Sequence, residues 1–187
     1  MGRWLAGWIT RVLLRLAYFA HGADGLNALF LIMPARFLTP TLRRHGATIG
    51  NGVEMQTPIT FHNVSPTFGQ HYKNLNVGAD SYLGKEVFLD LADEIRIENN
   101  VTVSMRVMLL THTHAGKSPL IEGRLKPSYA PIVLGTGCYI GAGAIILPGV
   151  EIGRGAIVGA GAIVTCMVES GTTVVGMPAR VIQSAAE

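Results

Sequence analysis

The amino-acid sequence predicts a mainly β fold in which six-residue repeats are wound into a stacked coil, preceded by an N-terminal α-helical arm. Three observations support this fold class. Aliphatic residues recur at every sixth position in the second half of the chain. Glycine is abundant, with 23 residues among 187, and it often follows these aliphatic positions. The chain is 49% hydrophobic but only 7% aromatic, as expected of a narrow core that holds aliphatic side chains and has little space for rings.

The composition also excludes several classes of protein. Disorder requires low hydrophobicity and high charge, and a charged share of 14% is also low for a coiled coil. The two cysteines are too few for a disulfide scaffold or a cysteine-rich zinc module, and they suit a reducing compartment, so we expect a cytoplasmic protein. The formal net charge is +3, but the basic residues beyond position 44 are scattered, which argues against a nucleic-acid partner.

Residues 1–44 form the predicted arm, whose first helix covers residues 3–20. One side of this helix carries Arg3, Arg11 and Arg15, and the other side is apolar. The arginines interrupt the apolar run, so the segment suits neither a membrane span nor the core of a signal peptide. Two interpretations stay open. The helix either lies in the membrane interface, at the inner face of the membrane, or packs on the protein body or a neighbouring subunit, which is the commoner use of an amphipathic helix.

Two short helical pieces follow within the arm. Asp24 is a candidate N-cap for a helix over residues 26–33, which Pro34 would end. A third piece would begin near Ala35, and Pro40 would limit it. The arm is therefore expected to contain three helical segments before the repeats begin.

The six-residue repeat is clearest over residues 134–169, where an aliphatic residue occupies six successive repeat positions: Leu134, Ile140, Ile146, Ile152, Val158 and Val164. Glycine usually follows, then two turn residues and a small residue. Such a period fits a short strand plus a turn, with three such faces in each coil. The template extends back to Ile49, with irregular segments at 62–74 and 115–131. We therefore assign residues 45–182 to the coil, with a loop protruding at about 115–131, and residues 183–187 to a C-terminal tail.

Two stretches of the repeat resemble the hexapeptide-repeat acyltransferases, in the branch of the galactoside, maltose and nodulation O-acetyltransferases. They are CYIGAGAIILPGVEIGRGAIVGAGAIVT at 138–165 and VVGMPARVI at 174–182. The resemblance covers about residues 45–182. It implies a left-handed parallel β-helix, acetyl-CoA as the acetyl donor without a metal, and a homotrimer with active sites between adjacent subunits.

The resemblance also implies a catalytic histidine. In this branch a histidine follows an aliphatic run where a long loop leaves the helix, and the matching text VMLLTHTHAG at 107–116 gives His112 that position. The repeat register agrees, because an inward Leu109 puts His112 at a turn, just before the irregular segment. An imidazole can accept a hydroxyl proton and pass it to a departing thiolate. His114 is the rival base or a substrate contact.

The remaining candidate site residues come from the same resemblance. Asp90, one coil before the histidine, matches an acidic position that binds the acceptor hydroxyl or orients the histidine ring. The resemblance also implies five contacts to acetyl-CoA. Tyr139 would form an aromatic wall, and the backbone N–H of Ala142 would stabilise the oxyanion. Ala160 and Thr165 would line the CoA track, and the guanidinium of Arg180 would pair with a phosphate.

These features predict an acetyl-CoA-dependent O-acetyltransferase that acts on a hydroxyl of a sugar or glycan precursor, with His112 as general base in a direct transfer. N-acetylation of an amino sugar or an antibiotic on the same fold stays open. A metalloenzyme like the γ-class carbonic anhydrases would need three imidazoles converging on one metal, whereas only His112 and His114 lie near the repeat. A non-catalytic β-helix that serves assembly is the third alternative, and the histidine before the loop argues against it.

Overall fold

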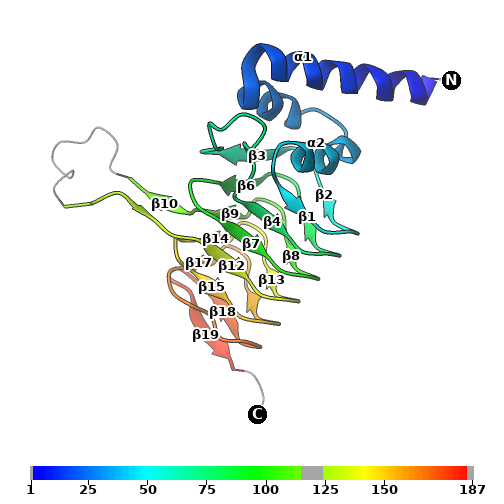
Figure 1. Cartoon of the computed structure of the whole chain (residues 1–187). Helices are drawn as coiled ribbons and strands as arrows, with labels where there is room; N and C mark the ends of the chain where they lie inside the picture. Colours follow the sequence, from blue (N-terminus) through cyan, green and yellow to red (C-terminus); the bar gives the residue numbers. More distant parts are fainter. Residues whose placement is uncertain (1, 115–123, 185–187) are drawn as a thin grey trace.

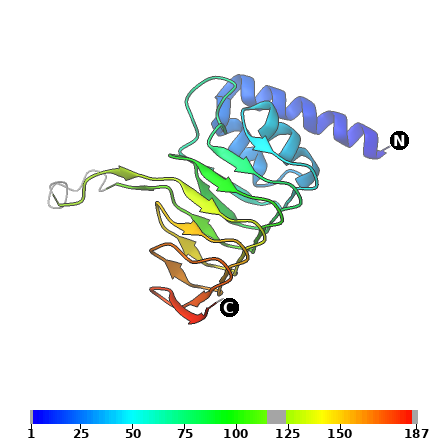
Figure 2. The same ribbon diagram turned by 60° about the horizontal axis from the view of Figure 1, so that its bottom comes forward.

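The computed structural model describes residues 2–114 and 124–184 of the chain. Figure 1 shows a stack of coils with the helices at its N-terminal end and the C-terminus at the opposite end. Figure 2, in which the bottom of the first view comes forward, shows a two-stranded ribbon that extends away from the stack. The fold is the predicted left-handed parallel β-helix with an N-terminal helical arm.

Each complete coil contributes one short strand to each of three sheets. The first sheet contains β1 (Thr48–Ile49), β4 (Leu75–Val77), β7 (Ile95–Ile97), β12 (Ile132–Leu134) and β15 (Glu151–Ile152). The second contains β2 (Glu54–Met55), β5 (Tyr82–Leu83), β8 (Thr102–Val103), β13 (Tyr139–Ile140), β16 (Ile157–Val158), β18 (Thr173–Val175) and β19 (Arg180–Gln183). The third contains β3 (Ile59–His62), β6 (Val87–Asp90), β9 (Met108–Leu109), β14 (Ile145–Ile146) and β17 (Ile163–Val164).

Within residues 2–114 and 124–184, two strand pairs are antiparallel. β10 (His112–Thr113) pairs with β11 (Ser128–Tyr129) and forms the base of the ribbon. This ribbon occupies the position of the predicted protruding loop, of which residues 115–123 lie outside the described residues. β19 folds back onto β18 at the C-terminal end, with Val181 opposite Val174. Of the predicted tail, residues 185–187 also lie outside the described part.

The aliphatic repeat positions form the core, as predicted. All six residues of the clearest block are at most 1% exposed: Leu134, Ile140, Ile146, Ile152, Val158 and Val164. The parallel register stacks them from coil to coil, so that Leu134 lies between Ile97 and Ile152. Each such side chain contributes roughly 1.5–3 kcal/mol when it is fully buried. The stack is therefore stabilised by contacts between neighbouring coils, as in other repeat proteins.

Glycine has two separate roles in the turns. Gly155, three positions after Ile152, has a positive φ of 63°, and Asn100 takes the same place after Ile97 with a φ of 58°. Gly153 directly follows the inward residue, and a Cβ atom there would lie 2.5 Å from the backbone nitrogen of Ser170 in the next coil. The first role needs conformational freedom. The second needs the absence of a side chain. The sequence pattern alone does not distinguish these two roles of glycine.

The arm consists of α1 (Gly2–Phe30), a 3-10 helix η1 (Ala35–Phe37) and α2 (Leu38–Arg44). Gly22 has non-helical angles, with φ 57° and ψ −135°, so α1 changes direction there. Its second half covers the first coil, where the ring of Phe30 packs 5.6 Å from Phe61 and 5.9 Å from Tyr72. The arm thus closes the N-terminal end of the core.

The helix boundaries in the arm differ from those expected. Gly22 marks the break in α1, so the second helical half does not begin with Asp24 as its N-cap. Pro40 does not limit the third piece, because α2 passes through it and continues to Arg44. Pro40 is the third residue of α2, where a backbone N–H has no partner within the helix, so proline is tolerated. Among the described residues, no helix has the length and apolarity needed to cross a membrane.

Candidate active site

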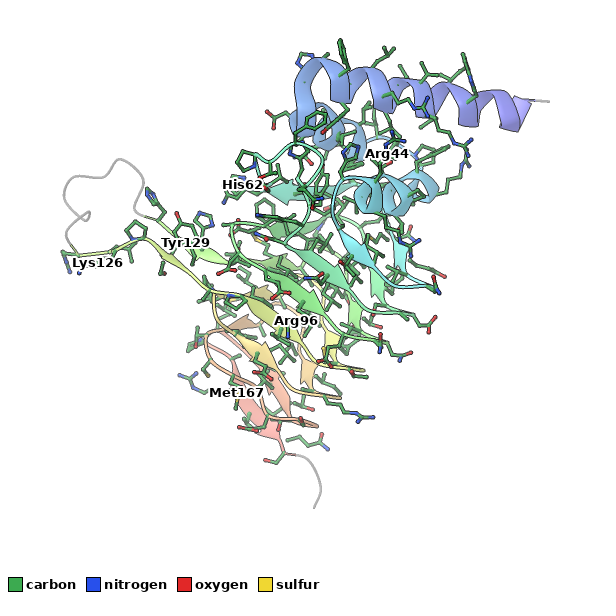
Figure 3. All side chains as sticks on the ribbon, in the orientation of Figure 1. Arg44, His62, Arg96, Lys126, Tyr129 and Met167 are labelled. Atoms are coloured by element: carbon green, nitrogen blue, oxygen red, sulfur yellow. The ribbon has the colours of Figure 1, made fainter. Side chains whose placement is uncertain are left out.

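The turns that lead from the third sheet to the first bring several polar residues together; we call this line of turns the His112 edge. β3 and β6 end at His62 and Asp90, which are paired in register. One coil further on, the chain leaves β9 and reaches His112. The ring of His112 lies 6.1 Å from that of His62 and is stacked 6.1 Å from that of Tyr129. Figure 3 shows His62 and Tyr129 on the same side of the molecule, with Tyr129 on the ribbon.

A buried carboxylate holds the imidazole of His112. Asp90 Oδ2 lies 2.5 Å from His112 Nδ1, and Asp90 is completely buried whereas the His112 side chain is 26% exposed. The backbone N–H of His112 also donates to Oδ2, at 3.1 Å. With Nδ1–H donating to the carboxylate, Nε2 is the ring nitrogen left to accept a proton.

Further hydrogen bonds fix the carboxylate of Asp90. The Thr111 backbone N–H donates to Oδ2 at 3.0 Å, and Asn63 Nδ2 donates to Oδ1 at 2.8 Å. Burial by itself would raise the pKa of Asp90. The hydrogen bonds from His112, Asn63 and Thr111, together with the charge of His112, outweigh burial and hold that pKa below its usual value. Asp90 therefore stays ionised in the folded protein near neutral pH.

Asn63 stands next to this pair. Its amide nitrogen is 3.3 Å from His112 Nδ1 as well as within hydrogen-bonding distance of Asp90. Because Nδ1–H already donates to the carboxylate, the Asn63 amide is a donor to Asp90 and only a neighbour of the ring. Its backbone has a positive φ of 50°, which Asn tolerates better than most residues. This turn aims the amide back at Asp90.

A pocket of about 480 Å³ opens at the His112 edge, and its lining combines imidazole, amide and aromatic groups: Asn63, Ala92, His112, His114 and Tyr129. His114 is exposed and contributes to this lining. The buried carboxylate of Asp90 is saturated by groups of its own chain, so the geometry favours the orienting role over the alternative in which it contacts an acceptor.

Three of the expected CoA contacts lie at a different place. The turns that lead from the second sheet to the third, residues 141–144 and 159–162, form what we call the Ala142 edge. Gly161 N–H donates to the Ala142 carbonyl at 2.8 Å, whereas the Ala142 N–H has no acceptor among the described residues. Ala160 is exposed directly above it. Tyr139 is 43% exposed on the adjacent strand β13 and accepts a hydrogen bond from Ser104 Oγ at 3.1 Å.

The other two expected CoA contacts are separated from each other. Arg180 lies opposite Val175 at the end of β18, near the Ala142 edge, and it is exposed while Nη1 donates to the Ala179 carbonyl at 2.9 Å. Thr165 is exposed in a turn from the third sheet to the first, in line with the His112 edge. A single chain therefore does not bring His112 together with Ala142, because a whole sheet width separates the two edges.

Two residues at the His112 edge were absent from the sequence prediction. Asn63 lies in the irregular segment 62–74, and Tyr129 lies in the irregular segment 115–131. The interruption of the repeat was the only signal that marked either segment. The part of the chain that the structure describes contains no group of three His, Cys, Asp or Glu residues arranged to hold a metal ion.

Comparisons with known proteins place this geometry in context. Residues 131–166 match the family described as bacterial transferase hexapeptide (six repeats). Nodulation protein L of Rhizobium meliloti is 35% identical over 151 residues, which cover 75% of this chain and 81% of that protein.

Two solved structures share the fold at lower identity. A maltose O-acetyltransferase from Clostridium difficile has a TM-score of 0.74 and 24% identity, covering 94% of this chain and 89% of that one. A hexapeptide-repeat acetyltransferase from Vibrio cholerae, solved in complex with acetyl coenzyme A, has a TM-score of 0.74 and 21% identity, covering 88% and 86%.

Proposed function

Because this chain belongs to the hexapeptide-repeat transferase family, we propose that it is an acetyl-CoA-dependent O-acetyltransferase that acts on a hydroxyl of a sugar or glycan precursor. The family membership and the acetyltransferase relatives support acetyl transfer from acetyl-CoA. The maltose O-acetyltransferase that shares the fold supports a carbohydrate acceptor.

The observation that carries the proposal is the contact between Asp90 and His112. A general base needs a free basic nitrogen in a fixed orientation, and the 2.5 Å contact at Nδ1 supplies the orientation. The ionised Asp90 also stabilises the positive charge that develops when His112 takes a proton. The arrangement supports a histidine base better than a structural histidine, because Asp90 is buried while His112 keeps its access to the pocket.

In the proposed reaction, Nε2 of His112 takes the proton of the acceptor hydroxyl while the hydroxyl oxygen attacks the acetyl carbonyl carbon. Bound acetyl-CoA supplies the acetyl group as a thioester. The carbon–sulfur bond breaks, and His112 returns the proton to the departing sulfur, so the enzyme ends unchanged. The Ala142 N–H, which has no acceptor among the described residues, would donate to the carbonyl oxygen as negative charge develops there. No acyl-enzyme is needed.

We further propose that the active site forms between two copies of the chain in a homotrimer. The main support is the separation of His112 from Ala142, since the transfer needs both at one acetyl group. The outer faces of the sheets add to it. The outward positions of the third sheet are apolar in four successive strands, Phe88, Met108, Ile145 and Ile163, whereas those of the first sheet include Asn76, Arg96 and Glu151. An apolar outer face is suited to contact with another copy.

The pocket at the His112 edge supports a hydroxylated acceptor. Asn63 and His114 offer hydrogen-bonding groups, and Tyr129 offers an aromatic face, a combination that fixes the orientation of a polar ligand. An amine could enter the same pocket, so N-acetylation is the second possible reaction. The test below distinguishes it from O-acetylation.

The test is CoA release from acetyl-CoA with a panel of sugars and amino sugars, for the wild-type protein, His112→Ala and the neighbouring control His114→Ala. We expect release with a sugar hydroxyl, a loss of about 10²–10⁴-fold in His112→Ala, and a smaller loss in His114→Ala. Activity that is unchanged in His112→Ala, or that appears only with amine acceptors, would contradict the proposal. Binding of acetyl-CoA measured by calorimetry separates a lost base from a lost cofactor site.

A further inference from the structure

A large opening separate from the candidate active site lies between the first half of α1 and α2. It has a volume of about 1160 Å³. α1 contributes Trp8, Arg11, Leu14, Arg15 and Tyr18, and the other wall carries Phe37, Pro40, Thr41 and Arg44. Figure 3 shows Arg44 in the space between these helices. We call this opening the arm groove.

The arm groove is strongly basic. Arg11, Arg15, Arg36 and Arg44 line it, and no acidic residue does. Across the described ranges, none of these four arginines forms an ion pair. Arg36 instead lies over the ring of Phe37, at 4.9 Å from its centroid. Four guanidinium groups around one partly apolar opening repel one another, and an anion with several acceptor oxygens would relieve that repulsion.

A buried imidazole in the same groove lacks a partner. His45 is 7% exposed and lines the groove, and its Nδ1 atom has no hydrogen-bond partner among the described residues. Its ring packs 4.2 Å from that of Tyr18, which fixes its position. Buried polar atoms in folded proteins nearly always have a partner, so His45 Nδ1 is a hydrogen-bonding group that a ligand at this place could satisfy.

The first half of α1 also exposes an apolar surface, which begins at the rim of the groove with Trp8 and Phe19. Five large side chains are between 44% and 90% exposed: Trp8, Ile9, Leu13, Leu16 and Phe19. Between Gly7 and Ala20, only Leu14 is buried. A monomeric protein rarely exposes so many apolar groups together, and this row lies beside arginines rather than acidic residues.

From these observations we propose that the arm groove binds the phosphate head group of an anionic phospholipid, while the exposed face of α1 lies among the acyl chains. Arginine forks and an unpaired imidazole match phosphate oxygens, and the apolar row matches the lipid tails. Free phosphate would use only the basic part of this surface. A second copy of the chain would bring the same arginine-rich groove, with no acidic counterpart. The proposal concerns binding alone and does not depend on acetyl transfer.

The first test measures sedimentation of the full chain with vesicles. We expect binding to vesicles that contain phosphatidylglycerol and much weaker binding to pure phosphatidylcholine vesicles. Arg11→Gln/Arg15→Gln should bind the anionic vesicles about tenfold or more weakly, because each arginine near an anionic surface adds to the attraction. Arg96→Gln/Arg154→Gln removes the same charge from exposed positions on the β-helix and should bind as the wild type does.

Three results of this first test would overturn the proposal. They are equal losses in the two double variants, equal binding to neutral and anionic vesicles, and absence of binding. If binding is absent and Leu13→Asp/Leu16→Asp, on the exposed face of α1, changes the oligomeric state, the arm instead packs on another copy. Circular dichroism of each variant establishes that the fold is retained.

The second test locates the ligand. In a Trp4→Phe variant, Trp8 is the remaining tryptophan, and its emission should shift to shorter wavelength on addition of anionic vesicles. The ring signals of His45 should shift with soluble short-chain phosphatidylglycerol and much less with inorganic phosphate alone. Equal shifts with inorganic phosphate would identify a free-phosphate site and contradict lipid binding. Acetylation assays on the same variants show whether the two sites act separately.

Discussion

Asp90 Oδ2 and His112 Nδ1 lie 2.5 Å apart, although they belong to consecutive coils and are separated by 22 positions in the sequence. The carboxylate is buried at the end of β6, and the imidazole begins β10 one coil later. The chain thereby places a charged acceptor behind the ring and leaves the other ring nitrogen for chemistry. This pairing is the basis of the first two predictions.

Replacing Asp90 with Asn should lower kcat by about 10²–10⁴-fold, because an amide no longer fixes the Nδ1–H tautomer or stabilises the protonated ring. The KM for acetyl-CoA should change little, since Asp90 is buried beneath His112 and lies on the other edge from Ala142. The pH–rate profile should also shift, and a purely structural role of Asp90 would not produce such a shift. Asp93→Asn, a neighbouring turn carboxylate, is the matched control and should keep its kcat. Unchanged kcat in Asp90→Asn would refute the orienting role.

The stability of the protein should depend on pH through Asp90. Its pKa is lower in the folded state than the value of about 3.9 in an unfolded chain, so ionised Asp90 stabilises the fold above that value. This contribution is lost as the pH falls below about 4 and through the lower folded-state pKa. Urea unfolding should therefore show that the stability difference between wild type and Asp90→Asn shrinks from pH 6 towards pH 3. A constant difference would mean that Asp90 does not titrate with folding.

Mixed oligomers should reveal whether the active site is shared. His112→Ala and Ala160→Trp should each be inactive, the first through loss of the base and the second through obstruction of the Ala142 edge. In trimers that contain both variants, one interface in three combines an intact His112 with an intact Ala160, if each site takes these residues from different copies. The mixed trimers should therefore have about a third of the wild-type activity. Two tagged chains purified in tandem provide the sample. If the co-expressed sample stays inactive, the site lies within one chain.

The two kinds of turn glycine should respond differently to substitution. In Gly153→Ala, the new Cβ would lie within 2.8 Å of backbone atoms of Ser170 and Glu169, so neighbouring coils must separate, at about 1–3 kcal/mol or more. Gly155→Asn should cost less than about 1 kcal/mol, because Asn tolerates a positive φ and no heavy atom lies within 4 Å of its Cβ position. Thermal unfolding of both variants measures the contrast. Equal losses would show that the two turns are equivalent.

Much of the fold was predictable because the inward residues recur at a fixed interval. Leu134 and Ile140 could be assigned to the core from spacing alone, and both are completely buried. The same register, counted from Leu109, predicted that His112 stands at a turn, whereas the structure has it as the first residue of β10, just after the chain leaves the third sheet. In the arm, Gly22 and Pro40 show the limit of local signals. Glycine allows a break without requiring one, and proline can stand in the first turn of a helix as well as end a helix.

The candidate site was predictable only in part. Asn63 and Tyr129 lie in segments without a period, so no rule of spacing could assign their partners. Asp90 was recognised as an acidic position, but the choice between acceptor contact and orientation of His112 needed the observed hydrogen bonds.

The sequence by itself determined which residues face the axis of the β-helix, since the six-residue period gives the buried aliphatic residues the same place in every repeat. Tertiary structure decided which side chains meet across coils, because contacts such as Asp90–His112 depend on how the chain returns to the same edge. It also decided that His112 and Ala142 stand on different edges and that the arginines of the arm surround one groove. These relationships arise from distances between segments far apart in the chain, which no local pattern records.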